Sequence, residues 1–289
     1  MPDRTDAIRE IARKWLADGV VEAVVGWEKG THGNRTAPVL VRSPEQADRL
    51  VFNEHCTNNL MTYLKRPVLK GMQKVGIVAK GCDIKSLIGL LQESQVEREK
   101  VKILAVTCPG VKKDDGTAPV KCRACDVNTP AFFDERAGDP VPSNPDPKAR
   151  LEELEKLDAM SPAERHRFWR TEFDKCIRCY ACRAACPMCY CQECIADRNL
   201  PQWIDAAPRP RGNFAWNFIR AWHLAGRCVQ CRACERACPQ GITLMLLNRM
   251  IADEISQDFG YLAGAGSPED AAFFAAFKDN DNDAFILGK

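Results

Sequence analysis

The spacing of the cysteines constrains this chain more than any other feature. The segments CIRCYACRAACP and CVQCRACERACP, which begin at Cys176 and Cys228, repeat the pattern C-x2-C-x2-C-x3-C-P. In this pattern three thiolates wrap one cubane iron-sulfur cluster, and the fourth reaches the cluster of the other copy. The repeat therefore predicts two 4Fe-4S clusters in one region. The first set is Cys176, Cys179, Cys182 and Cys238, and the second is Cys228, Cys231, Cys234 and Cys186.

Disulfides and structural zinc are the alternatives for a chain with 16 cysteines. The sequence begins MPDRTDAIRE, without the apolar stretch of a signal peptide, so we expect a cytoplasmic protein in which disulfides are rare. Structural zinc favours two C-x2-C pairs without a following proline, which argues against zinc at the two repeats. No apolar run reaches the roughly 18 residues that span a bilayer, so we expect no direct membrane insertion.

Residues 171–245 resemble the bacterial two-cluster ferredoxin family through these two motifs. The resemblance implies an α+β or α-rich domain that carries electrons. Two features differ from small ferredoxins. Tyr180 and Arg232 stand where those proteins usually have glycine, and the copies are separated by a longer stretch that contains Trp203 and APRPRGNFAWNF.

Three further cysteines, Cys189, Cys191 and Cys194, follow the first motif in the segment MCYCQEC. Free thiols this dense would oxidise in a redox protein, so we expect them to bind a metal. Both an iron-sulfur cluster and zinc are compatible with their spacing. Cys56 could complete a fourth site with them that bridges two domains; it could equally be an ordinary core residue.

The N-terminal half predicts an α/β domain. Apolar residues at helical spacing follow Thr5, a predicted cap, and stop at Gly19, while residues 20–27 and 37–43 read as strands. Further along, residues 74–81, 82–98 and 100–110 read as strand, helix and strand. Such a βαβ unit has parallel strands joined by a right-handed crossover.

Cysteines follow both strands of this βαβ unit. Cys82 and Cys108 lie just beyond the carboxyl ends of the strands, at the edge where α/β sheets bind ligands. Cys122 and Cys125, in the segment KCRACD, can fold back to complete a set of four. We therefore predict a third cluster on Cys82, Cys108, Cys122 and Cys125. The alternative is that Cys82 and Cys108 are small buried hydrophobic residues, which leaves the C-x2-C pair unexplained.

The segments KGCDIKSLIGLLQESQVERE, TCPG and KCRACDVNTPAFFDERAGD resemble the beta-subunit family of deazaflavin-dependent hydrogenases and dehydrogenases, together with proteins associated with heterodisulfide reductases. The resemblance covers residues 20–140. It implies a 4Fe-4S cluster on the third cysteine set and, in the family, a flavin beside it. FAD is not favoured here, because family enzymes use a longer catalytic domain.

The proline-rich segment GDPVPSNPDPKAR marks a domain boundary. We expect an α/β domain over residues 1–140, a linker and helix over 141–170, and a two-cluster domain with a helical C-terminal tail over 171–289. A capping box at Ser161 and Glu164 predicts a helix that leads into Cys176. From Cys176 to Gln240 there are nine arginines, no lysine and four acids, a net charge of +5 that would offset anionic clusters.

These features predict an iron-sulfur electron-transfer subunit of anaerobic metabolism. Its partners would be a hydrogenase, formate dehydrogenase or other flavoprotein on one side and a heterodisulfide-reductase-like subunit on the other. The net charge of +2 and the absence of a P-loop or G-x-G-x-x-G argue against nucleic acid and nucleotide ligands. We favour a non-catalytic subunit. The alternative is a flavin-dependent oxidoreductase that acts on a deazaflavin, with the clusters as its internal wire.

Overall fold

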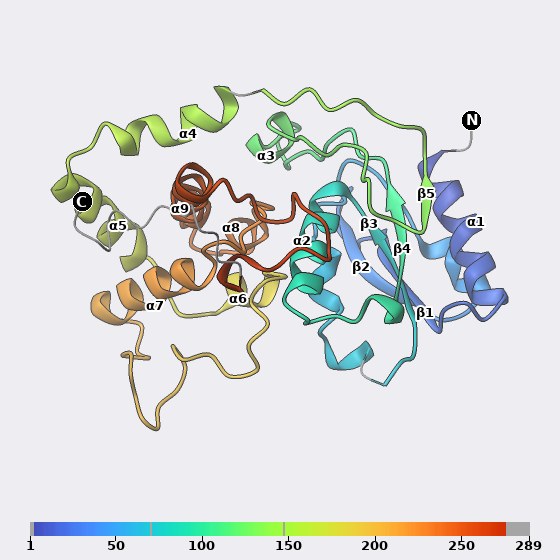
Figure 1. The fold of residues 1–289 in the computed structure, drawn as a ribbon, viewed down its shortest axis with the longest axis horizontal. Helices are drawn as coiled ribbons and strands as arrows, with labels where there is room; N and C mark the ends of the chain where they lie inside the picture. Colours follow the sequence, from blue (N-terminus) through green and yellow to red (C-terminus); the bar gives the residue numbers. More distant parts are fainter. Residues whose placement is uncertain (1–2, 70, 147, 276–289) are drawn as a thin grey trace. The chain divides into compact units, whose positions relative to one another are not determined.

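The computed structural model describes residues 3–69, 71–146 and 148–275. The internal contacts divide the chain into two units, Met1–Arg150 and Leu151–Lys289. Figure 1 colours the chain from the blue N-terminal unit to the red end of the C-terminal unit. The division falls at the end of the proline-rich segment.

The N-terminal unit is built on a five-stranded sheet with the strand order β2-β1-β3-β4-β5. β2 pairs antiparallel with β1, and the other neighbours are parallel. Ile77 of β3 lies opposite Val25 on one side and Ile103 on the other. The strands are β1 (Ala23–Lys29), β2 (Thr36–Val41), β3 (Val75–Ala79), β4 (Val101–Val106) and β5 (Glu135–Ala137).

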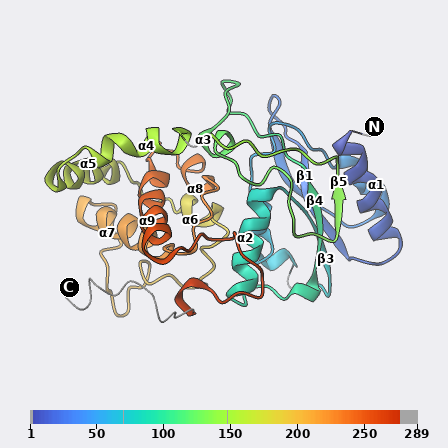
Figure 2. The same ribbon diagram turned by 45° about the horizontal axis from the view of Figure 1, so that its top comes forward.

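Two long helices, α1 (Arg4–Ala17) and α2 (Gly81–Gln92), lie on opposite faces of this sheet (Figures 1 and 2). Because both faces are covered, every residue of β3 is buried. On one face the ring of Trp15 lies directly over Gly76, where a Cβ atom would meet ring carbons at 3.2 and 3.3 Å. The βαβ unit predicted from the sequence is confirmed: β3, α2 and β4 follow one another, and the two strands pair in parallel.

The first helix begins earlier than the sequence predicts. Asp3 occupies the N-cap position, so the expectation that Thr5 caps the helix is wrong. The Thr5 hydroxyl instead donates to the carbonyl oxygen of Phe52 and accepts from its backbone N–H. The remaining short elements of this unit are α3 (Val120–Arg123) and the 3-10 turns Pro44–Arg49, Leu60–Tyr63, Pro67–Leu69 and Arg98–Lys100.

The described part of the C-terminal unit is helical and contains no strand. The predicted capping box is confirmed, because Ser161 Oγ accepts from Glu164 N–H while the Glu164 carboxylate accepts from Ser161 N–H. Trp169, Phe173 and Trp216 anchor its core. The helices are α4 (Lys148–Asp158, which starts just before the division), α5 (Pro162–Asp174), α6 (Ala181–Ala185), α7 (Pro210–His223), α8 (Ala233–Arg236) and α9 (Leu244–Phe259), followed by a 3-10 turn at Phe273–Ala275.

The last part of the predicted C-terminal tail, residues 276–289, lies outside the described residues. Within the described ranges, none of the helices combines the length and apolar character needed to cross a membrane.

Replacing Gly81 by alanine should destabilise the N-terminal unit. A Cβ atom at Gly81 would lie 1.9 Å from the backbone oxygen of Val127, so the loop between Cys125 and Asn128 would have to move. Overpacking of this kind costs about 1–3 kcal/mol. Gly33→Ala is the control without a steric clash: a Cβ atom there would meet no atom within 4 Å, so only the backbone strain of its left-handed φ of +57°, about 1–2 kcal/mol, remains. The melting temperature of G81A, measured without oxygen, should be lower than that of G33A. Equal melting temperatures of the two variants would contradict the packing argument.

Candidate functional site

The two cysteine motifs share one backbone conformation. Arg178 and Tyr180 in the first copy have φ angles of 57° and 58°, and Gln230 and Arg232 in the second have 57° and 59°. Each costs about 1–2 kcal/mol in a residue with a side chain, so the surrounding structure must impose it. Left-handed residues in tight turns direct backbone N–H groups toward one concave surface, which suits an anionic group. Tyr180 and Arg232, which stand where small ferredoxins usually have glycine, therefore adopt the left-handed conformation that glycine favours.

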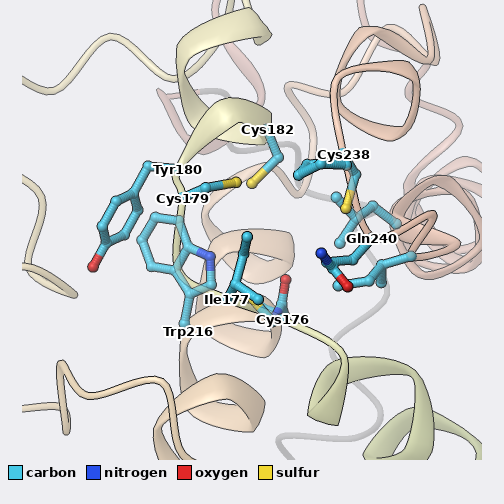
Figure 3. A pocket seen from close by; sticks show the side chains of 12 residues that line it. Cys176, Ile177, Cys179, Tyr180, Cys182, Trp216, Cys238 and Gln240 are labelled. Atoms are coloured by element: carbon cyan, nitrogen blue, oxygen red, sulfur yellow. The ribbon is translucent and has the colours of Figure 1, made fainter.

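The first predicted cysteine set lines one cavity in the C-terminal unit (Figure 3). Its empty volume is about 310 Å³, and Trp216, Ile242 and Leu244 supply apolar parts of its wall. Figure 3 shows the sulfur atoms of Cys179, Cys182 and Cys238 turned into the same space. The cysteines at this cavity are Cys176, Cys179, Cys182 and Cys238. Four thiols around an apolar cavity are a suitable donor set for a cubane cluster.

The second predicted set is also gathered in this unit. Burial raises the pKa of Cys228 well above its usual 9.0, and the nearby thiols of Cys234, Cys231 and Cys186 raise it further. Burial likewise raises the pKa of Cys234, with Arg220 acting in the opposite direction. The structure therefore places Cys186 of the first motif copy close to Cys228, Cys231 and Cys234 of the second copy.

The third predicted set surrounds the carboxyl edge of the sheet in the N-terminal unit. Cys82 lies in the first turn of α2, and Cys108 follows β4. Burial raises the pKa of Cys108 to about 12, and Cys82 and Cys122 are close enough to raise it as well. Burial raises the pKa of Cys125, with further contributions from Cys82 and Cys122. These four thiols are thus close to one another, and a cluster on them stays a prediction.

A buried lysine beside this third set was missed by the sequence analysis. Lys80 is 1 % exposed, and its Nζ lies 2.9 Å from Asp83 Oδ2 and 3.9 Å from the centre of the Trp27 ring. Burial alone would lower the Lys80 pKa, but Asp83, Cys82 and Cys108 raise it. Lys80 therefore places a positive charge next to the thiols, as one half of a buried ion pair with Asp83. Its position between a strand and the helix that carries Cys82 was the only signal in the sequence.

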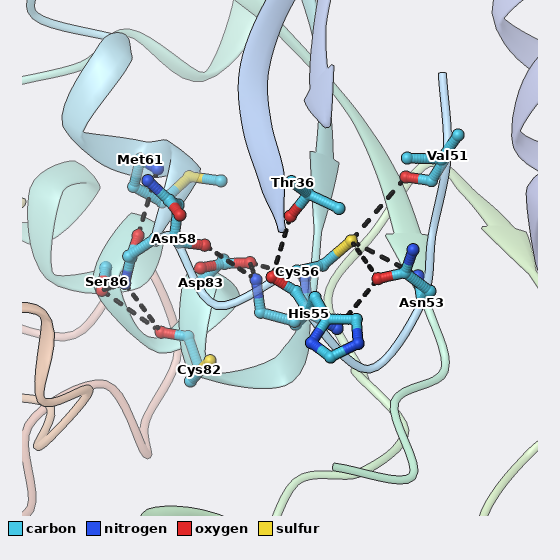
Figure 4. A network of polar contacts seen from close by, with 12 residues as sticks. Thr36, Val51, Asn53, His55, Cys56, Asn58, Met61, Cys82, Asp83 and Ser86 are labelled. Carbon is cyan, nitrogen blue, oxygen red and sulfur yellow. Dashed lines mark hydrogen bonds and ion pairs between the residues drawn. The ribbon is translucent and has the colours of Figure 1, made fainter. Parts of the chain in front are cut away.

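Cys56 lies in the N-terminal unit and is fully buried. Its Sγ accepts from Asn53 N–H at 3.3 Å and donates to the Val51 oxygen at 3.8 Å (Figure 4). Burial raises its pKa. The predicted fourth site would join Cys56 to three cysteines of the other unit, and it stays a prediction.

Cys189, Cys191 and Cys194 line a second cavity of the C-terminal unit, with an empty volume of about 520 Å³. The Cys189 side chain also forms a hydrogen bond with the side chain of Cys186, which lowers the pKa of Cys189. In the described part of the chain, no three His, Cys, Asp or Glu side chains are placed to hold a single metal ion. A cubane cluster is larger than an ion and spaces its thiolates further apart.

The Lys80–Asp83 pair should stabilise the edge of the sheet only as a pair. Lys80→Met leaves the Asp83 carboxylate buried without its counter-charge, which typically costs about 3–5 kcal/mol. Lys80→Met combined with Asp83→Asn removes both charges and should regain most of this loss. Denaturant unfolding of both variants measures the difference. Equal losses in the single and double variants would show that the charge of Asp83 is not the cause.

No protein-family model matches the chain. A relative from Methanocaldococcus jannaschii, the F420-dependent formate dehydrogenase subunit beta, is 31% identical over 96 residues, which cover 33% of this chain and 25% of the relative. The match thus spans a quarter of that relative's length. The F420-dependent formate dehydrogenase 1 subunit beta of Methanococcus maripaludis is 21% identical over an alignment that covers 87% of this chain and 88% of the relative.

Among solved structures, a chain of the F420-reducing [NiFe] hydrogenase complex from Methanosarcina barkeri matches with 17% identity and a TM-score of 0.32, over 38% of this chain and 39% of that one. The resemblance predicted from the sequence is confirmed by the two curated relatives: the chain is related to the beta subunits of F420-dependent dehydrogenases.

Proposed function

We propose that this chain is an iron-sulfur electron-transfer subunit of an oxidoreductase complex. The observation that carries the proposal is the cavity lined by Cys176, Cys179, Cys182 and Cys238, because these cysteines come from both motif copies in the grouping that a pair of cubane clusters requires. Cys228, Cys231, Cys234 and Cys186 would hold the second cluster. Bound clusters supply one-electron transfer, and the protein holds them in place and adjusts their potentials.

A third cluster would add an electron carrier in the N-terminal unit. Its ligands would be Cys82, Cys108, Cys122 and Cys125. The neighbouring thiols and the charge of Lys80 support this assignment. A lysine next to a cluster favours the more negative reduced form, so it should raise the reduction potential.

The names of the relatives support an oxidoreductase complex and, more narrowly, a formate dehydrogenase catalytic subunit as partner. A hydrogenase as electron donor and a heterodisulfide-reductase-like subunit as acceptor remain predictions of the sequence. We assign the chemistry on the substrate to that catalytic partner, and electron transfer to the thiol sets of this chain.

The proposal is tested by the iron and acid-labile sulfide content of protein purified without oxygen. Three clusters require about 12 irons per chain, at about four per cubane. The double variant Cys122→Ser/Cys125→Ser should lose about four of them. The double variant Cys231→Ser/Cys234→Ser should lose about four from the C-terminal unit.

The matched control for both variants is Cys56→Ser, since Cys56 is as buried as any thiol in the chain but belongs to none of these three sets. It should retain all iron. A colourless protein that contains zinc and no sulfide would contradict the proposed function. Unchanged iron in the Cys122→Ser/Cys125→Ser variant would remove the third cluster alone.

A further inference from the structure

The second cavity of the C-terminal unit has a wall of unusual composition. Cys189, Cys191 and Cys194 share this wall with the cations Arg183, Arg220 and Arg227, and no carboxylate lines it. Three thiols and three guanidinium groups around one space suit a metal centre that becomes anionic once thiolates bind it.

Arg220 places a buried positive charge at this cavity, close to Cys189 and also to Cys234 and Cys186 of the second predicted set. Arg220 is 5 % exposed, and its Nε has no hydrogen-bond partner among the described residues. One Nη donates to the Cys182 oxygen at 3.2 Å, and no ion pair joins Arg220 to a carboxylate in the described part of the chain. Arg183, by contrast, pairs with Asp197. A buried cation without an anion costs several kcal/mol, and Cys189, Cys234 and Cys186 would supply the negative charge beside Arg220 as metal-bound thiolates.

A single zinc ion fits this space poorly. Zn–S bonds of about 2.3 Å hold tetrahedral thiolates about 3.8 Å apart. No three cysteine, histidine or acidic side chains of the described residues are placed for one ion. The cysteines of the two repeated motifs are likewise not placed around a single ion, although their sequence pattern is that of iron-sulfur cluster ligands. Thiols that line one cavity without converging on a point are compatible with a cubane, which spaces its ligands further apart than a single ion does.

We propose that Cys189, Cys191 and Cys194 bind an additional iron-sulfur cluster that is contained within the C-terminal unit, with His223 of the same cavity wall as the fourth ligand. Arg220 supplies the counter-charge. This inference rests on the proposed function and adds one cluster to the chain of electron carriers. It also removes Cys56 from the set of ligands.

The proposed cluster would adjoin the second motif cluster. The Cys189 side chain is hydrogen-bonded to the Cys186 side chain, and Cys186 belongs to the second predicted set. A ligand of one cluster would thus touch a ligand of the other. Electrons could pass between the two clusters over a short distance without crossing between units.

The test is the metal content of the full-length variant Cys191→Ala/Cys194→Ala, purified without oxygen and compared with the wild type. We expect about four irons and four sulfides fewer per chain, at about four per cubane, with zinc unchanged. Iron and sulfide equal to those of the wild type would overturn the proposal, and so would the loss of one zinc. The single variant Cys191→Ala, at an exposed position, keeps the test decisive if the double variant does not fold, since it too should lose iron.

Cys56→Ala is the control that separates this proposal from a site shared between the units. It should retain every iron, and a loss equal to that of the Cys191→Ala/Cys194→Ala variant would show that Cys56 is a ligand after all. His223→Ala should change the electron paramagnetic resonance of one cluster, and an unchanged spectrum would remove His223 from the coordination.

The two proposals fail differently. If the wild type contains no iron and no sulfide, the proposed function is wrong. If the signals of the two motif clusters persist while the Cys191→Ala/Cys194→Ala variant keeps all its iron, the electron-transfer function stands and only the additional cluster is wrong.

Discussion

The burial of thiols close to one another is the constraint on which both units depend. Burial raises the pKa of Cys108 to about 12 and that of Cys182 to about 11, so neither ionises readily by itself. A thiolate in such surroundings needs positive charge beside it, which an iron core supplies directly. Lys80 and Arg220 are placed to share that role. Cluster binding would therefore release protons and stabilise the folded chain, which couples metal loading to folding.

The local sequence predicts the framework of this arrangement well. The βαβ unit could be predicted because its two buried strands, around Ile77 and Ile103, are short continuous apolar runs. The segment between them instead places its apolar residues at helical spacing. The motif spacing and the repeat predict which thiols gather, because the fourth cysteine of each copy is expected to reach the set of the other copy. Cys238 joins the first set although it lies 62 positions from Cys176 (238 − 176), and only the repeat indicated this.

Other features depend on tertiary packing and leave little trace in the sequence. β5 has three residues, two of them charged, and exists because Glu135 and Arg136 pair with β4. A lysine that is buried against Trp27 cannot be distinguished by pattern from an exposed one, and neither can Arg220 on α7. The left-handed conformation of Tyr180 contradicts its local preference. It is imposed by the turn between Cys179 and Cys182, and Arg232 has the same conformation in the second motif copy.

The central claim is that reducible clusters, rather than zinc, occupy these thiol sets. Low-temperature electron paramagnetic resonance of the dithionite-reduced protein tests it most directly. Because the two motif sets lie in one unit, we predict overlapping signals of reduced 4Fe-4S clusters that are broadened by magnetic interaction between neighbours. A reduced protein without any paramagnetic signal, together with stoichiometric zinc, would contradict the account.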